Sequence, residues 1–186
     1  MSTLLSRRSF FQSAAAAGLG GVLPTPACIG PEYAPDADLV CDPDDGEVYL
    51  IGARQGRVTI KFDKRNTGVA AMSLLTEDIV PGDGIPIHKH GAEEEWIVIE
   101  RGRGVLTFGE ETFRVVPGSM ALVPRGMWHG LRNEGEEPMR MVFGYTPAGF
   151  EDYFRAIGVR PGEPRKRLGA AEWSRINADF HVTYRD

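Results

Sequence analysis

No apolar run in this chain reaches the ~18 residues that a membrane-spanning helix needs. The chain also lacks an excess of basic residues, since 21 Lys and Arg stand against 26 Asp and Glu and the formal net charge is −5. This balance disfavours nucleic acid or an anionic membrane surface as a partner. The one dense basic segment, Arg165-Lys166-Arg167, is more consistent with a solvated turn, and no pair of DNA-binding helices is evident.

Cysteine is scarce, with only Cys28 and Cys41 in the chain. Neither lies near the clustered histidines, so neither is a candidate metal ligand. Outside the cytoplasm the two could form a disulfide that closes the irregular segment between them. Cys28 could instead carry a lipid, if an export signal were cut directly before it.

The first residues of the chain predict such a signal. Arg7 and Arg8 precede an apolar stretch at 13–23, and small residues follow. This order resembles a twin-arginine signal peptide, and the alternative is a flexible or tag-like tail. We therefore expect residues 1–27 to be a signal peptide, and the protein to be periplasmic or secreted through the twin-arginine route.

Histidine is scarce as well, yet three of the four histidines are grouped. His88 and His90 are two residues apart, so on a β-strand both rings point to the same face. Glu95 begins the next strand-like run, and His129 follows a turn at the start of another. Three imidazoles and a carboxylate suit Fe, Mn, Ni, Cu or Zn. The fourth histidine, His181, is more consistent with a structural or surface role.

The carboxylate ligand has two rivals, Glu93 and Glu94. Glu94 fits a shorter spacing, but Gly102 then falls one residue out of register, whereas Glu95 fits on both sides. We expect Glu93 and Glu94 to be solvated loop charges. Lys89 alternates with the histidines and should point away from the metal.

Glycines and a proline frame the four candidate ligands in two motifs. The first motif contains Gly82, His88, His90, Glu95 and Gly102, and the second contains Gly118, Pro124, Gly126, His129 and Asn133. This pair resembles the two signature motifs of the cupin family. The resemblance implies a small all-β jelly-roll barrel, a metal held by the four ligands, a small-molecule substrate and, commonly, a homodimer.

Short strand-like runs agree with this fold class, since they recur at close intervals between Gly and Pro turns. By themselves they do not distinguish a sandwich from a barrel. The expected strands outside the motifs are Glu47 to Ile51, Arg57 to Phe62, Val69 to Leu75, Gly104 to Phe108, Thr112 to Val116, Met120 to Val123 and Met139 to Tyr145. We expect a linker at 28–45, the cupin barrel at 46–146 and a helical extension at 147–186.

The extension begins with a helical period. Phe150, Tyr153, Phe154 and Ile157 form one apolar stripe, and Gly158 can end the helix. The stripe is most simply a face packed on the barrel, and its functional alternative is a lid over the barrel mouth. Residues 170–178 predict a second short helix.

The pocket walls follow from strand parity around the ligands. The residues that should face inward are Ile97, Ile99, Met127, Leu131, Met139, Met141, Phe143 and Tyr145. They would form an apolar pocket for a ring or chain, or simply fill the barrel core. Trp96 and Trp128 alternate with ligands and should face outward.

Four protein ligands leave one or two metal positions open, which is the mark of a catalytic site. A substrate with two oxygens could fill them, and Glu95 would either remain a ligand or act as general base. We expect a dioxygenase first, in keeping with a likeness of the aromatic helix to quercetin-dioxygenase-like cupins. The alternatives are a non-redox isomerase, lyase or decarboxylase, and a binding protein without turnover. Fe or Mn is the expected metal, because the signal-peptide resemblance implies export in folded form, and loading before export would let Fe or Mn in where affinity order alone favours Cu²⁺.

Overall fold

In the computed structural model the described residues are 34, 37–52 and 56–185. They all lie in the second of two compact units, Pro31–Asp186. The expected signal peptide at 1–27 and Cys28 lie outside the described residues. Export and the Cys28–Cys41 disulfide therefore stay predictions.

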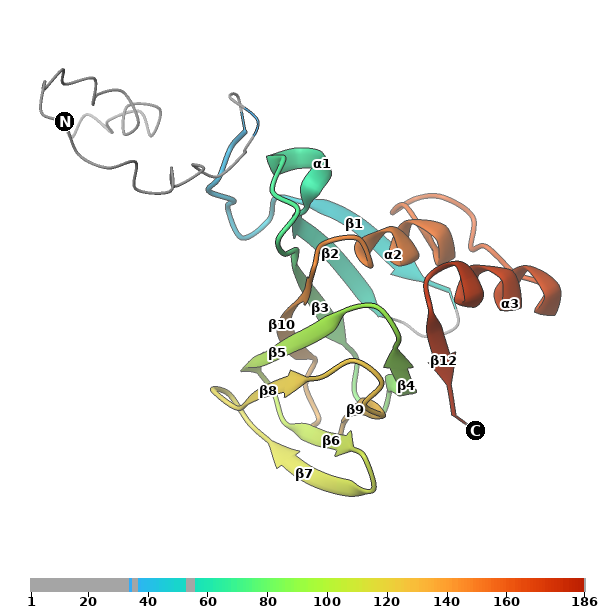
Figure 1. Ribbon diagram of the computed structural model, residues 1–186. Coiled ribbons are helices and arrows are strands. Elements are labelled where there is room, and N and C mark those ends of the chain that lie inside the picture. The colour runs from blue at the N-terminus through green and yellow to red at the C-terminus, as the bar shows by residue number, and fades with distance from the viewer. Residues whose placement is uncertain (1–33, 35–36, 53–55, 186) are drawn as a thin grey trace, which may run out of the picture. The chain divides into compact units, whose positions relative to one another are not determined.

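Two antiparallel sheets form the described unit (Figure 1). The seven-stranded sheet has the order β11-β1-β2-β3-β10-β5-β8, and the five-stranded sheet has the order β12-β4-β9-β6-β7. The first sheet contains β11 (Gly158–Val159), β1 (Glu47–Ile51), β2 (Arg57–Phe62), β3 (Leu74–Ile79), β10 (Met139–Thr146), β5 (Glu94–Arg101) and β8 (Met120–Val123). The second contains β12 (Val182–Tyr184), β4 (Gly84–His90), β9 (His129–Asn133), β6 (Gly104–Phe108) and β7 (Glu111–Val115). This architecture confirms the predicted all-β class.

The hydrophobic core draws side chains from both sheets. Along β5 the buried residues Ile97 and Ile99 alternate with more exposed ones, as expected for a strand with one covered face. They belong to one core cluster with Met141 of β10, Leu106 of β6 and Leu131 of β9. The inner faces of the two sheets therefore share a single apolar interior.

The strand expected at Val69 to Leu75 was wrong in its bounds, because β3 begins only at Leu74. A short helix that the sequence analysis did not predict, α1 (Lys64–Thr67), precedes it. Asp63 caps this helix in a capping box, and Gly68 ends it with φ +79°. After the helix the Val69 amide donates to Thr67 Oγ1 at 3.0 Å, and regular strand pairing begins at Leu74.

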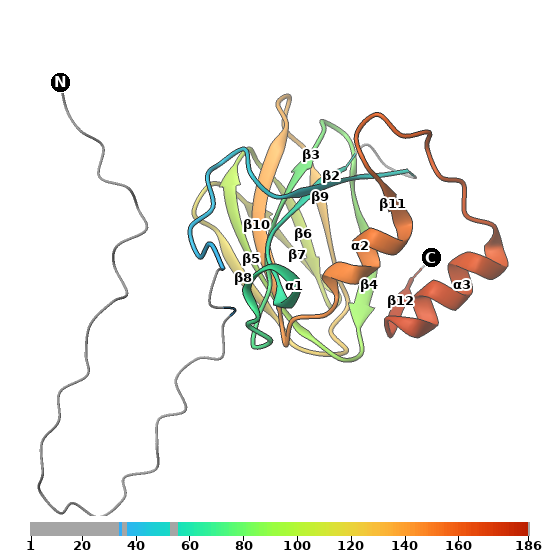
Figure 2. The same ribbon diagram turned by 90° about the horizontal axis from the view of Figure 1, so that it is seen from above.

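Helices α2 and α3 and the final strand β12 come after β10 in the chain. Helix α2 (Glu151–Ile157) buries Phe150 at its start and Tyr153, Phe154 and Ile157 along its length, which confirms the predicted stripe. Helix α3 (Ala170–Asp179) also forms close to its expected place. Strand β12 was not predicted, and it pairs with β4, as Figure 2 also shows. Among the described residues, no helix has the length and apolar character needed to cross a membrane.

Candidate metal centre

The structure brings together all four predicted ligands from three strands. His88 and His90 lie on β4, Glu95 on β5 and His129 on β9, and all four residues are buried. One donor atom from each lies within 4.8 Å of the others. Residues from both sheets thus converge on one point, as the strand parity predicted.

Backbone carbonyls orient two of the imidazoles. His88 Nδ1 lies 2.8 Å from the carbonyl oxygen of Pro86, and His129 Nδ1 lies 3.1 Å from that of Met127. A carbonyl only accepts hydrogen bonds, so each Nδ1 carries a hydrogen and donates it. Each Nε2 consequently faces the centre of the cluster, in the arrangement that metal-binding histidines use.

Glu95 contacts two of the three histidines of the cluster. Its Oε2 lies 2.8 Å from His129 Nε2 and 3.2 Å from His90 Nε2. Burial acts to raise the pKa of Glu95, but the hydrogen bonds and charges of the two histidines outweigh it and hold the pKa far below its usual value. Glu95 is therefore a carboxylate at neutral pH. Because so acidic a group is a weak base, this geometry favours its ligand role, and the general-base role stays a prediction.

Burial and the neighbouring groups shift the pKa values of His88 and His129 in opposite directions. Burial and the neighbouring rings of His129 and His90 hold the pKa of His88 well below its usual value. For His129, burial lowers the pKa, but the hydrogen bond and charge of Glu95 raise it above the usual value. A metal ion would thus find a neutral His88 and a carboxylate, and would compete with one proton for His129 Nε2.

These residues fit a divalent transition metal. The donors are nitrogen and oxygen, they are buried, and two imidazoles are held in the required tautomer. Such an ion would be held by His88, His90, Glu95 and His129. Fe, Mn, Ni, Cu and Zn all accept this ligand set.

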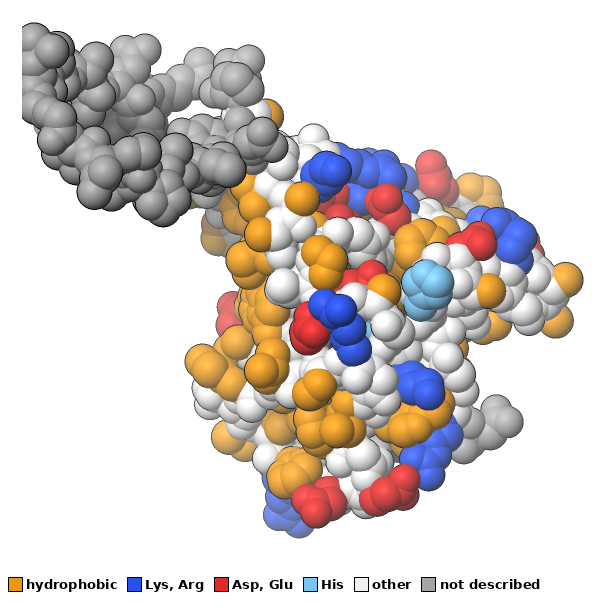
Figure 3. Space-filling view, viewed as in Figure 1, with side chains coloured by type: hydrophobic (Ala, Val, Ile, Leu, Met, Phe, Trp, Pro, Cys, Tyr) orange, Lys and Arg blue, Asp and Glu red, His pale blue; other side chains and the backbone are white. Residues whose placement is uncertain are grey.

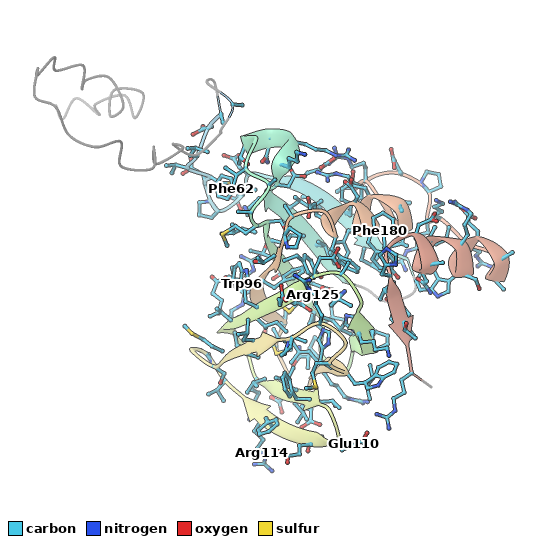
Figure 4. The ribbon with its side chains drawn as sticks, in the orientation of Figure 1. Phe62, Trp96, Glu110, Arg114, Arg125 and Phe180 are labelled. Atoms are coloured by element: carbon cyan, nitrogen blue, oxygen red, sulfur yellow. The ribbon has the colours of Figure 1, made fainter. Side chains whose placement is uncertain are left out.

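The rival carboxylates do not join the cluster. Glu94 forms an ion pair with Arg125, labelled in Figure 4, at 2.9 Å between Oε1 and Nε. Glu93 is half-buried, with Oε2 shielded from solvent, so the expectation of a fully solvated charge was wrong for this residue. Lys89 points away as predicted, with its Nζ 4.7 Å from the centroid of the Trp128 ring.

A cavity of about 90 Å³ opens beside the cluster. His88, Glu95 and His129 form part of its wall, and most other lining side chains are apolar or aromatic. Those predicted by strand parity are Ile97, Leu131, Met141, Phe143 and Tyr145. Ile99 and Met139 instead fill the core, and Met127 packs partly buried against it. Neither Trp96 nor Trp128 lines the cavity.

The helical extension supplies walls that the sequence analysis left open. All four stripe residues of α2 line the cavity, and the Phe150 ring lies 4.3 Å from that of His90. The apolar face of α2 therefore both packs on the barrel and lines the cavity beside the candidate ligands. Trp173 and Tyr184 from α3 and β12 also line the cavity and were not predicted, whereas His181 is exposed and outside the cluster.

Glu77 on β3 is a further cavity residue that the sequence analysis missed. It is 1% exposed and lies across from Met141 in the sheet register. Parity could have found it, because it shares the inner face of β3 with Leu75 and Ile79. The expected strand, however, stopped at Leu75.

Comparison with known proteins shows similarity to cupins. Residues 75–145 match the family model described as a cupin domain. An uncharacterized protein from Methanocaldococcus jannaschii is 36% identical over 80 residues, which is 42% of this chain and 64% of that protein. The polyketide synthase CurC of Streptomyces cyaneus is 36% identical over 67 residues, covering 36% of this chain and 44% of that protein. The chain thus spans less than two thirds of either relative.

Solved structures show the same fold at low identity. A predicted oxalate decarboxylase from Thermotoga maritima has a TM-score of 0.54 at 18% identity, with 59% of this chain and 99% of that chain covered. An RmlC-like cupin from Shewanella frigidimarina has a TM-score of 0.52 at 12% identity, with 64% and 97% covered. Both likenesses concern the fold alone. Residues 75–145 thus match a cupin domain, and the two antiparallel sheets have the jelly-roll fold of cupin structures.

Proposed function

We propose that this protein is a metal-dependent enzyme that oxidises a small oxygenated organic molecule with O₂, as a dioxygenase. The observation that supports the proposal is the buried cluster of three histidines and Glu95, which forms part of the wall of an apolar cavity. Open metal positions beside a preformed pocket are typical of catalytic rather than structural sites.

The metal, when bound, would polarise a substrate oxygen, lower its pKa and, if redox-active, open the way to reaction with O₂. The protein's own groups set the conditions for this chemistry. The aromatic side chains at α2 line the cavity, where they would limit the entry of bulk water and contact the apolar part of a substrate. Burial, together with the charges of Glu95 and Glu77, raises the pKa of Tyr145 well above its usual value. Its hydroxyl therefore stays protonated and can donate a hydrogen bond inside the cavity.

Oxygen uptake tests the proposal. Protein loaded with Fe²⁺ or Mn²⁺ is mixed with flavonols, β-diketones and catechols in an oxygen electrode, and His129→Ala protein serves as control. We expect uptake with at least one class, and none with the control. Product formation without uptake would point to an isomerase, lyase or decarboxylase. Saturable binding with neither uptake nor product would point to a binding protein.

We further propose that the twin-arginine route exports the protein in folded form with Fe or Mn already in place. The support is the order of Arg7, Arg8 and the following apolar stretch, together with the coupling of metal binding to folding. Affinity order alone would instead favour Cu²⁺ in the periplasm. Elemental analysis of natively exported protein tests the proposal, and copper without Fe or Mn would contradict it.

We also propose that the protein is a homodimer that pairs through β8. This strand is at the edge of the seven-stranded sheet, and Met120 and Leu122 on it are 78% and 69% exposed. Hydrophobic side chains gather over β5 and β8 in Figure 3. An uncharged, apolar edge strand is suited to antiparallel pairing with its own copy, which would cover both side chains.

A further inference from the structure

The C-terminal strand places a tyrosine against a candidate metal ligand. In the pairing of β12 with β4, Tyr184 is directly opposite His88 and Val182 is opposite His90. Cross-strand neighbours in an antiparallel pair lie on the same face. The Tyr184 ring accordingly stacks on the His88 imidazole, with 5.7 Å between centroids and 27° between planes.

Hydrogen bonds and packing hold the Tyr184 ring in this position. Its hydroxyl lies 2.9 Å from that of Tyr153 on α2, which in turn donates to Asn177 Oδ1 on α3 at 3.1 Å. The Trp173 ring of α3 packs against Tyr184 at 5.9 Å between centroids. Both helices of the extension therefore contribute to the placement of one ring.

Backbone hydrogen bonds also hold strand β12 at both of its ends. The amide of Gly91 donates to the carbonyl of His181 at 2.8 Å, and the amide of Arg185 donates to the carbonyl of Ile87 at 3.0 Å. A Cβ on Gly91 would lie 3.1 Å from the His181 oxygen, so glycine permits this close approach. The Arg185 side chain binds Glu110 at 2.9 Å. This strand is thus a fixed wall of the site.

The His88 ring also contacts two other ligands, His129 at 4.2 Å and His90 at 4.8 Å between centroids, with their planes tilted by 47° and 90° to its own. The carbonyl of Pro86 holds Nδ1, and Nε2 lies 3.1 Å from His90 Nε2 in the cluster. Tyr184 differs from these neighbours because it lies outside the ligand set and is nearly parallel to the His88 ring, at 27°, so it restricts the plane of that ring from the opposite strand. Groups that orient a ligand in this way tune the affinity and geometry of a metal site.

We propose that Tyr184 is a positioning residue of the metal centre, whose ring sets the plane of the His88 imidazole and is itself held by α2 and α3. The inference rests on the proposed function, since it assumes that His88 binds a metal. It makes the helical extension a part of the metal centre rather than an appendage of the barrel.

The test uses Co²⁺ as the probe, in the full chain, with four variants. Tyr184→Phe keeps the ring, Tyr184→Leu keeps apolar bulk without a ring, and Tyr184→Ala removes both. Thr183→Ala is the matched control, because Thr183 is on the same strand and exposed. The readouts are the visible spectrum of bound Co²⁺ and the affinity from competition with a chelator, and circular dichroism confirms folding.

We expect the control to match the wild type in spectrum and affinity, and Tyr184→Phe, which keeps the stacked ring and loses only the hydroxyl bond to Tyr153, to stay closer to the wild type than the variants without a ring. Tyr184→Leu and Tyr184→Ala should shift the Co²⁺ absorption bands and weaken binding by about tenfold or more, as losses of ligand-orienting groups do. The leucine variant keeps the test decisive if the alanine variant fails to fold. Unchanged spectra and affinities in every Tyr184 variant would overturn the inference, and so would equal losses in Thr183→Ala. A wild-type protein that binds no Co²⁺ would overturn the metal site itself, and this inference with it.

Discussion

His88, His90, Glu95 and His129 each have a distinct environment, although all four are buried in one cluster. Carbonyl oxygens direct the rings of His88 and His129, and Glu95 accepts from His90 and His129. Substitution of any one ligand therefore changes both the donor set and the charge balance of the site. These differences make the residues separately testable.

Removal of an imidazole should remove most of the bound metal. We expect occupancy to fall below about a tenth in His88→Ala or His129→Ala, because binding energy depends on the full donor set. Elemental analysis measures the metal, and His181→Ala is the control, since His181 is exposed and outside the cluster. Full metal occupancy in the double variant with both His88→Ala and His129→Ala would refute the site.

The role of Glu95 is tested separately with Glu95→Gln. Retained metal with lost activity would support a base role, and lost metal would support ligation.

Metal affinity should fall as the pH falls. The pKa of His129 lies above its usual value, and below that pKa a proton occupies the nitrogen that the metal needs. Below that pKa each pH unit should weaken binding by about tenfold, and above it this dependence should vanish. Chelator competition between roughly pH 8 and pH 5 measures the effect. An affinity that is constant over this range would contradict the prediction.

Helix α2 contributes to the cavity on one side and to a partly buried ion network on the other. Arg155 donates to Glu47 of β1 at 2.8 Å, to Asp63 at 2.6 Å and to Asp152 at 2.6 Å. Asp63 is fully buried and also caps α1. One guanidinium thereby joins α2 to β1 and α1, and it fixes the helix whose aromatic face covers the metal site.

The loss of this guanidinium should be costly. We expect Arg155→Ala to lower the free energy of unfolding by about 3–5 kcal/mol, because it leaves the Asp63 carboxylate buried without its cation. Urea denaturation measures the change. Arg175→Ala breaks only an exposed pair with Asp179 and should cost less than about 1 kcal/mol. Equal losses in the two variants would contradict a buried network.

The two sheets of the unit differ in how their edges are covered. Helix α3 and the C-terminal strand occupy one edge of the five-stranded sheet, whereas β8 ends the seven-stranded sheet with two exposed apolar side chains. Such an edge favours association with another strand. The proposed homodimer would cover it.

Charges on β8 should separate the dimer. We expect the double variant Met120→Glu and Leu122→Glu to run as a monomer in light scattering after size exclusion, while the wild type runs as a dimer. Val40→Glu is the matched control, since Val40 is 59% exposed and outside the sheets. A wild-type monomer, or a double variant that stays dimeric, would contradict pairing through this strand.

Most strands could be read from the sequence because their signals are local. The resemblance to the two cupin motifs singled out His88, His90, Glu95 and His129, and the period of two in strands explains why such side chains can share a face. The aromatic stripe of α2 was equally readable from its helical period. Strand bounds were less readable, as at Val69 to Leu75, where the capped helix α1 ends at Thr67 and β3 begins only at Leu74.

Contacts between distant parts of the chain were beyond the reach of these patterns. Strand β12 has only three residues, and its pairing with β4 depends on which sheet edge remains open once the barrel has formed. The stacking of Tyr184 on His88 and the entry of Glu77 into the cavity follow from that assembly. The sequence by itself thus indicated which residues can bind a metal. Only the tertiary structure decided which side chains surround them, because those side chains come from segments far apart in the sequence.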